Sequence, residues 1–187
     1  MAKKMGEYTM SWLQSIDFAI LDWIAENLRC AILDVFFPAF TFLGNSGWIF
    51  ILTAVIMLFF KKTRKIGLAI GLALIFGLIF GNLTLKPLIA RIRPFDVRPY
   101  IELIISKPSE FSFPSGHTLA AFETAAAIFM FNKKAGTCAL IFAAVMGFSR
   151  LYLYVHYPSD VIAGAVFGSL FGIVAAVIIR RIFRKTN

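Results

Sequence analysis

Charged side chains are scarce in this chain of 187 residues, in which Asp, Glu, Lys and Arg together make up 16% of the sequence. A soluble domain of this length carries about 25% charged residues. Because hydrophobic residues reach 59%, the composition excludes an ordinary soluble domain. We expect residues 1–187 to form a single integral membrane domain, with an N-terminal interfacial segment over 1–45 and a helical core over 46–187.

Cysteine is also rare, and Cys30 and Cys138 lie far apart in apolar surroundings. They form no C-x-x-C pair, and neither has metal-ligand spacing from a histidine. The pattern therefore predicts no metal site, and we interpret both cysteines as packing residues.

Acidic residues are outnumbered, since ten Asp and Glu stand against nineteen Lys and Arg, for a net charge of +9. Ten of the cations fall into three clusters without an acid: Lys61, Lys62, Arg64 and Lys65; Lys133 and Lys134; and Arg180, Arg181, Arg184 and Lys185. Such clusters between apolar runs are typical of cytoplasmic loops, whereas a nucleic-acid-binding protein places its basic patch on a polar surface. The charge thus indicates membrane topology, and nucleic acid is not an expected partner.

Long apolar runs fill most of the remaining sequence. A membrane-spanning helix needs about 20 mostly apolar residues, and five stretches come close to this: 46–60, 66–85, 117–132, 136–155 and 161–180. The basic clusters follow the first, third and fifth stretches, so these three points share the cytoplasmic side. The sequence predicts an all-α bundle of about five transmembrane helices in the cell membrane, with 86–116 and 156–160 facing the extracellular or periplasmic side.

Residues 11–29 have the pattern of an amphipathic helix. At about 100° per residue, one half of the helix carries apolar side chains: Trp12, Leu13, Ile16, Ile20, Trp23, Ile24 and Leu28. The other half carries polar ones: Gln14, Asp22, Glu26 and Arg29. Because these charges forbid spanning, we expect the helix to lie in the outer membrane interface. The alternative is a short helix of the soluble type that packs against the bundle.

Glycines repeat at four-residue spacing in the last apolar stretch, at Gly164, Gly168 and Gly172. This spacing lets helix backbones approach closely in lipid. We favour tight packing inside the bundle over a dimer interface, and the sequence leaves the oligomeric state open.

The chain has only two histidines, and both stand among cations at the predicted outer face. Lys86 ends the second apolar stretch, Arg93 follows it, and Arg150 lies in the last turns of the fourth. A single lysine or arginine near a helix end commonly reaches for the interface. Three of them on one side with His117 and His156 indicate a shared anion. Phosphate is the anion that these residue types suit best, because phosphoryl transfer needs cations, backbone N–H groups, a nucleophile and an acid.

The run Pro114-Ser115-Gly116-His117 opens the third stretch. Ser115 is a good helix N-cap, and the free N–H groups of a first helical turn form an anion site. Gly116 allows close approach of the backbone. His117 would then stand beside the anion, where it can protonate a leaving oxygen.

His156 and Asp160 are four residues apart in the turn before the last stretch. If this turn is nearly helical, the carboxylate can meet the imidazole and fix its tautomer. The oriented imidazole can attack phosphorus. Asp160 also suits the first turn of the last helix as an acid near its N-terminus.

Taken together, the residues resemble the three-part signature of the type 2 phosphatidic acid phosphatase superfamily, which is shared with vanadium haloperoxidases and glucose-6-phosphatases. The matching motifs are Lys86-x6-Arg93-Pro94, Pro114-Ser115-Gly116-His117 and Ser149-Arg150-x5-His156-x3-Asp160. The resemblance implies a metal-independent phosphomonoesterase or pyrophosphatase that uses no cofactor and forms a phosphohistidine on His156. It also implies that His117 is the acid and that phosphate is bound by Lys86, Arg93, Ser115, Gly116 and Arg150.

A site near the outer interface suits a lipid phosphate drawn from the bilayer. We favour undecaprenyl diphosphate, with phosphatidylglycerol phosphate or phosphatidate as alternatives. Vanadate-dependent halide oxidation and a non-enzymatic lipid carrier or scramblase are the competing functions. The apolar spans argue against the first, and the presence of both histidines argues against the second.

Two further features have open interpretations. Glu123 is an acid inside the third stretch, where an ionisable residue suggests function. It either pairs with a site cation, lines a lipid cavity or makes a structural hydrogen bond, so we leave it outside the catalytic set. The connection 94–113 is expected to form a lid, an acyl-chain gate or a simple cap.

Overall fold

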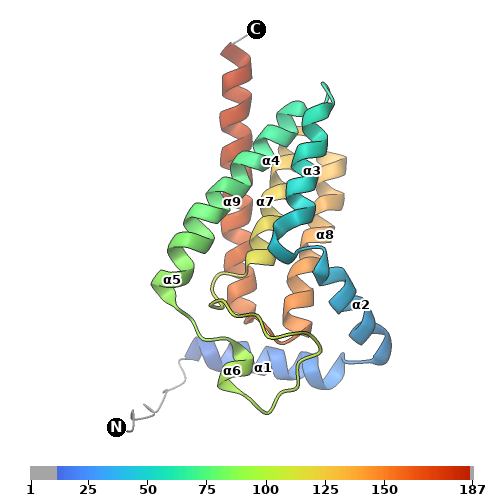
Figure 1. The fold of residues 1–187 in the computed structure, drawn as a ribbon, viewed down its shortest axis with the longest axis vertical. Coiled ribbons are helices and arrows are strands. Elements are labelled where there is room, and N and C mark those ends of the chain that lie inside the picture. Colours follow the sequence, from blue (N-terminus) through green and yellow to red (C-terminus); the bar gives the residue numbers. More distant parts are fainter. Residues whose placement is uncertain (1–11, 186–187) are drawn as a thin grey trace.

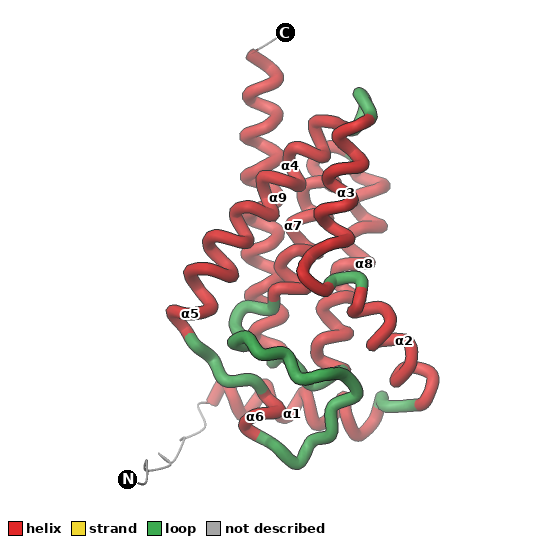
Figure 2. Tube along the Cα trace, viewed as in Figure 1, coloured by secondary structure: helices red, strands yellow, loops and turns green. Residues whose placement is uncertain are grey.

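The computed structural model describes residues 12–185, and every regular element in this part of the chain is a helix (Figures 1 and 2). Residues 1–11, the start of the predicted N-terminal segment, lie outside the described residues. The α-helices are α1 (Trp12–Asn27), α2 (Ala31–Phe42), α3 (Trp48–Phe59), α4 (Arg64–Phe76), α5 (Lys86–Ile89), α6 (Pro94–Val97), α7 (Gly116–Phe131), α8 (Lys133–Tyr152) and α9 (Pro158–Lys185). A 3₁₀ turn, η1 (Asn45–Gly47), precedes α3, and a π-helical stretch, η2 (Gly77–Leu85), continues α4.

Helix α7 stands in the middle of the bundle and packs against α4, α8 and α9 (Figure 1). Three segments are long and apolar enough to cross a membrane, namely Arg64–Val97, Lys133–Tyr152 and Pro158–Arg184. The pair α2 and α3, bent by 41°, counts as a fourth if it is one broken span. The predicted all-α membrane bundle is confirmed. The remaining predicted stretch, 117–132, forms α7, which with 16 residues is shorter than these segments.

The structure changes the prediction for residues before 46. The N-terminal segment includes a second helix, α2, which turns into α3 through η1. Ser46 (φ +51°) and Gly47 (φ +70°) adopt left-handed backbone conformations that end one helix direction and start another. The sequence did not reveal this break, because residue type permits these conformations without requiring them.

The glycine repeat of α9 packs against the backbone of α7. A Cβ atom at Gly168 would lie 2.5 Å from the Leu119 carbonyl oxygen, and one at Gly172 would lie 2.5 Å from that of Glu123. At Gly164 the nearest atom would be the Ser115 carbonyl oxygen, at 2.9 Å. The interpretation as packing inside the bundle is therefore confirmed. This close contact sets the register between α7 and α9, which both carry site residues.

The three basic clusters gather at one end of the bundle, as predicted. The Lys65 Nζ atom lies 5.1 Å from the centre of the Phe183 ring, and the Arg180 guanidinium lies 4.8 Å from that of Phe131. The connection between α5 and α7 and the whole of α1 lie at the opposite end (Figure 2).

Helix α1 lies across that opposite end (Figure 1). It packs on the bundle through Asp17, Phe18, Leu21 and Ile24. Five apolar residues of the predicted stripe are exposed on its other side, as the interfacial interpretation requires: Trp12, Leu13, Ile16, Ile20 and Trp23. The helix thus packs against the protein with one face and exposes an apolar face, and the placement of that face in a membrane interface stays a prediction.

The prediction that both cysteines are packing residues is wrong, because Cys30 and Cys138 are exposed. In a membrane protein an apolar sequence environment marks the lipid-facing surface as well as the core. Cys30 lies just before α2, and Cys138 lies in the second turn of α8.

Candidate active site

All eight predicted site residues lie at the end of the bundle opposite the basic clusters. Gly116 and His117 are half-buried, and the other six side chains are buried: Lys86, Arg93, Ser115, Arg150, His156 and Asp160. The cations Lys86, Arg93 and Arg150 and the second histidine are all near enough to His117 to act on it electrostatically. The three motifs therefore meet in one place.

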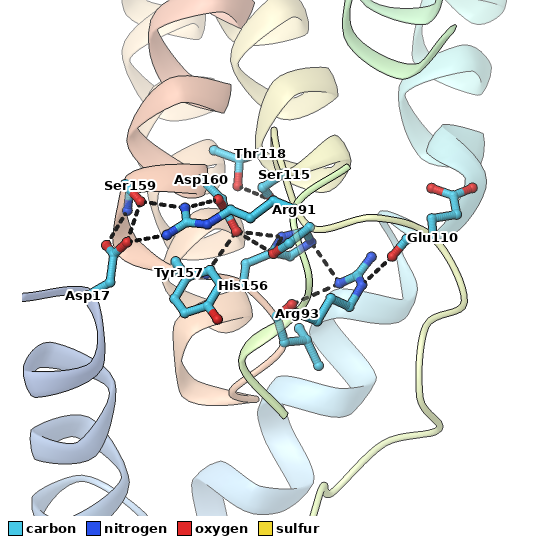
Figure 3. Close-up of polar contacts among 12 residues, drawn as sticks. Asp17, Arg91, Arg93, Glu110, Ser115, Thr118, His156, Tyr157, Ser159 and Asp160 are labelled. Atoms are coloured by element: carbon cyan, nitrogen blue, oxygen red, sulfur yellow. Dashed lines mark hydrogen bonds and ion pairs between the residues drawn. The ribbon is translucent and has the colours of Figure 1, made fainter. Parts of the chain in front are cut away.

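His156 lies in the short turn between α8 and α9, with 2% of its surface exposed. Its Nε2 atom is 3.2 Å from Arg93 Nη1, and its Nδ1 atom is 3.5 Å from Asp160 Oδ2 (Figure 3). Burial, together with the positive charges of Arg93 and Arg150, lowers the pKa of His156 to about 3, against the opposing effect of Asp160. The imidazole is therefore neutral at ordinary pH and can act as a nucleophile.

Asp160 is fully buried in the first turn of α9. Its Oδ2 atom accepts hydrogen bonds from the Ser112 hydroxyl and, at 3.0 Å, from the Tyr157 backbone N–H. Its Oδ1 atom is 2.5 Å from Arg91 Nη1. The predicted pairing with His156 is present but long, and Ser112, whose Oγ is 3.5 Å from His156 Nδ1, lies beside both groups.

Arg93 is held by backbone carbonyls on both sides. Its Nε atom donates to the carbonyl of Glu110 at 2.6 Å, and its Nη1 atom donates to that of Val155 at 2.8 Å (Figure 3). These bonds fix the guanidinium beside His156 Nε2. Arg150 is held by the Thr41 hydroxyl of α2, and its buried Nε atom has no partner among the described residues. Both cations are thus pre-positioned, with donor capacity left for an anion.

Lys86 forms an ion pair with Glu110 from the end of the 94–113 connection. This contact holds the pKa of the Glu110 carboxyl below its ordinary value. The pair lies in a groove of about 460 Å³ lined by η2 and the connection, with both apolar and polar walls: Leu78, Asn82, Leu83, Lys86, Pro87, Ser109, Glu110 and Phe111. The groove leads from the surface of the bundle to Lys86, a cation of the kind that binds phosphate, as a site for a lipid headgroup requires.

Ser115 occupies the N-cap position of α7, as predicted, but its side chain does not cap the helix. Its hydroxyl instead accepts a hydrogen bond of 2.9 Å from Thr118 Oγ1. No described side chain therefore occupies the first-turn N–H groups, which suits an anion site. A Cβ atom at Gly116 would lie 3.7 Å from Lys86 Nζ, so the backbone of this turn faces the lysine.

His117 contacts the break between α2 and α3. Its Nε2 atom is 3.0 Å from Asn45 Oδ1, and a Cβ atom at Gly44 would lie 2.6 Å from its Cδ2 atom. The break that the sequence did not reveal thus contacts His117, the residue predicted to be the acid, and holds its ring in place.

Sequence reasoning missed Thr41, Asn45, Arg91, Glu110 and Ser112, which contact predicted site residues, and Asp17, which binds Arg91. Arg91 lies inside the Lys86-x6-Arg93 motif, and its charge next to a signature arginine was an available signal. Asp17 was also visible as an acid in the amphipathic helix. Thr41, Asn45 and Ser112 carried no signal, because small polar residues are common near helix ends and in loops.

Glu123 lies apart from the cations of the site. It is buried in α7, its carboxylate faces Gly77 at the start of η2, and its Oε1 atom has no hydrogen-bond partner among the described residues. It forms no salt bridge with a described residue, so the interpretation as a partner of a site cation is wrong. Within residues 12–185 no group of three or more His, Cys, Asp or Glu side chains is arranged to hold a metal ion.

The 94–113 connection packs under the end of the bundle. Leu103, Ile104 and Ile105 are partly buried against a cluster that includes Ile24 and Phe95. This packing favours the interpretation as a cap, to which Glu110 adds a charged contact at the groove.

Comparison with known proteins agrees with this geometry. A family model described as the PAP2 superfamily matches residues 64–184. The chain is 34% identical to an undecaprenyl-diphosphatase of Sulfolobus acidocaldarius, over 68% of this chain and 63% of that protein, so less than two thirds of that relative is spanned. It is 29% identical to a lipid A 4'-phosphatase of Bacteroides thetaiotaomicron, over 87% of this chain and 76% of that protein.

Solved structures give the same result. A transmembrane PAP2-type phosphatidylglycerolphosphate phosphatase from Bacillus subtilis is similar with a TM-score of 0.76 and 28% identity, over 90% of this chain and 87% of that one. LpxE of Aquifex aeolicus is similar with a TM-score of 0.71 and 29% identity, over 86% and 94% of the two chains.

Proposed function

The chain belongs to the PAP2 superfamily, and from this premise we propose that it is a multi-pass membrane phosphatase that hydrolyses a lipid phosphate through a phosphohistidine intermediate. The observation that carries the proposal is the environment of His156, whose Nε2 atom faces Arg93 while its Nδ1 atom faces the buried carboxylate of Asp160. A neutral imidazole held in this way is a nucleophile aimed at a cationic pocket.

In the proposed reaction His156 Nε2 attacks phosphorus, and the bond from phosphorus to the leaving oxygen breaks. His117 gives a proton to that oxygen. Water then attacks the phosphohistidine, the P–N bond breaks, inorganic phosphate leaves, and the proton of the water returns to His117. Lys86, Arg93, Arg150 and the first-turn N–H groups at Ser115 and Gly116 stabilise the phosphoryl oxygens throughout. The scheme needs no metal ion and no cofactor.

Undecaprenyl diphosphate is the substrate that we favour. The Sulfolobus relative is named for this activity and is 34% identical. Phosphatidylglycerol phosphate is the second candidate, because the Bacillus subtilis structure with that activity covers 90% of this chain. Phosphatidate is a third lipid with the same reactive group. All three share a phosphate on an apolar chain, which the groove beside Leu78 and Leu83 accommodates.

Phosphate release by the purified chain in detergent tests the proposal. We expect release from at least one of undecaprenyl diphosphate, phosphatidylglycerol phosphate and phosphatidate, unchanged by EDTA. His156→Ala should reduce the rate by at least about 10⁴-fold. Loss of activity in EDTA would overturn the metal-free scheme. A variant as active as the wild type would remove His156 as the nucleophile, and an inert wild type would favour a lipid carrier.

We also propose that the site faces the extracellular or periplasmic side. The basic clusters at the other end support this orientation by the positive-inside rule. The exposed Cys30 lies at the site end of the bundle, next to Tyr152 at the end of α8. A membrane-impermeant maleimide should therefore label intact cells through Cys30, and Cys30→Ser should abolish that labelling. Labelling that appears only after the cells are opened would reverse the orientation.

A further inference from the structure

Arg91 lies between two buried carboxylates, one of which is that of Asp160 in the proposed catalytic pair of His156 and Asp160. Its Nη1 atom is 2.5 Å from Asp160 Oδ1, and its Nη2 atom is 2.7 Å from Asp17 Oδ2 (Figure 3). The guanidinium stacks on the Tyr157 ring, with 3.9 Å between its central carbon and the ring centre. Arg91 is neither a phosphate ligand of the signature nor a neighbour of the groove, so the proposed reaction leaves it without a role.

Asp17 comes from α1, which is far from the signature in the sequence. Only 2% of its surface is exposed. Besides Arg91, its carboxylate accepts hydrogen bonds from the backbone N–H of Ser159, at 2.9 Å, and from the Ser159 hydroxyl. Ser159 directly precedes Asp160. The first turn of α9 is therefore held from outside by a residue of the N-terminal helix.

This arrangement compensates the buried charge of Asp160 and orients its carboxylate toward His156. Asp160 is fully buried, and a buried carboxylate is costly unless a partner compensates its charge. Arg93 is bound at the Nε2 atom of His156, whereas Asp160 lies at the Nδ1 atom. When the phosphoryl group is transferred to His156 Nε2, the imidazole becomes cationic and needs an ionised carboxylate at Nδ1. Arg91 binds Oδ1 and thereby leaves Oδ2 directed at His156, Ser112 and the Tyr157 N–H.

We propose that Arg91 and Asp17 are positioning residues, which hold Asp160 ionised and oriented so that His156 can act as the nucleophile. The inference rests on the proposed phosphatase function and extends it to the N-terminal helix. It assigns a role in turnover to a side chain, Asp17, that lies outside residues 64–184 of the family match.

The chain offers a matched control in a second ion pair of the same helix. Arg98 binds Asp22, one turn further along α1, and stacks on the Phe18 ring at 3.9 Å. The exposed fractions of the two arginine side chains are nearly equal, 22% for Arg98 and 20% for Arg91. Both pairs fasten α1 to the connection after α5, but only Arg91 reaches Asp160. A comparison of the two separates positioning of Asp160 from attachment of α1.

The experiment measures kcat and KM of the purified full chain for the lipid phosphate that the wild type hydrolyses. Arg91→Gln should lower kcat about 10- to 100-fold, because it leaves the buried Asp160 charge uncompensated. Its KM should stay within about twofold of the wild type, since the phosphate ligands are untouched. Arg91→Lys should recover part of the loss, and Asp17→Asn should lower kcat about threefold to tenfold. Arg98→Gln should stay within about twofold of the wild type in both constants.

Equal losses in Arg91→Gln and Arg98→Gln would overturn the inference, because they would indicate attachment of α1 alone. A raised KM at unchanged kcat would also overturn it and would make Arg91 a substrate ligand. If Arg91→Gln does not fold, the same test is made with Asp17→Asn and Arg91→Lys, and their kcat values are compared with that of the control Arg98→Gln. A wild type that releases no phosphate would overturn the proposed function and this inference together, whereas an active wild type with indistinguishable variants would overturn only the inference.

Discussion

The two sides of the His156 ring are built from different kinds of residue. On the Nε2 side lie Arg93 and, around it, the other cations, His117 and the first turn of α7. On the Nδ1 side lie Asp160 and Ser112, with Arg91 and Asp17 behind them (Figure 3). The first side consists of signature residues, which are recognisable in the sequence. On the second side only Asp160 belongs to the signature, and its support depends on contacts between segments that are up to 142 positions apart in the chain, as for Asp17 and Ser159.

The difference shows which constraints act on each side. Binding a phosphate dictates residue type and spacing, because cations, a helix N-terminus and an acid must surround one small anion. Holding a carboxylate dictates only that its oxygens are satisfied, and many different residues can do so. The supporting side can therefore recruit α1, and Thr41 of α2 and Asn45 of η1 hold Arg150 and His117 in the same way. Asp17, Thr41 and Asn45 all lie outside the range 64–184 that the family model matches.

The largest effect in this comparison is expected on the Nε2 side, at His117. If His117 protonates the leaving oxygen, His117→Gln should lower kcat on a lipid alkyl phosphate by about 10²–10⁴-fold. The loss should be much smaller with 4-nitrophenyl phosphate, because its leaving group needs little protonation. Steady-state rates on the two substrates measure this ratio.

His156→Ala provides the control for that ratio. A nucleophile is needed whatever the leaving group is, so this variant should lose activity on both substrates alike. If His117→Gln loses the same factor on both substrates, His117 is not the acid, and the Nε2 side would consist of phosphate ligands only.

The sequence predicted which residues gather on the Nε2 side, because a phosphate site restricts side-chain type and spacing, and their catalytic roles stay predictions. All eight predicted site residues meet at one end of the bundle, and the basic clusters lie at the other. The predictions that failed depend on three-dimensional packing. The exposure of Cys138 could not be read from hydropathy, because lipid-facing and core positions are equally apolar in sequence. The Ser115 hydroxyl does not cap α7 but accepts a hydrogen bond from Thr118. Residue spacing does not determine which of these two local hydrogen bonds forms.

Helix boundaries show the same limit. The break at Ser46 and Gly47 depends on left-handed backbone conformations within an apolar stretch, and residue type alone permits them without requiring them. Helix α7, by contrast, matches the predicted stretch 117–132 to within one residue at each end.

The smallest effect is expected on the Nδ1 side, at Ser112. Its hydroxyl donates to Asp160 Oδ2, an oxygen that also accepts the Tyr157 N–H, while Arg91 binds the other oxygen. Because these partners remain, Ser112→Ala should remove one hydrogen bond worth about 1 kcal/mol and lower kcat about threefold to tenfold. Ser106→Ala, at an exposed position of the same connection, should leave kcat unchanged. A loss as large as that of His117→Gln would mean that Ser112 acts on His156 directly, across the 3.5 Å to Nδ1, and the supporting side would then be part of the chemistry.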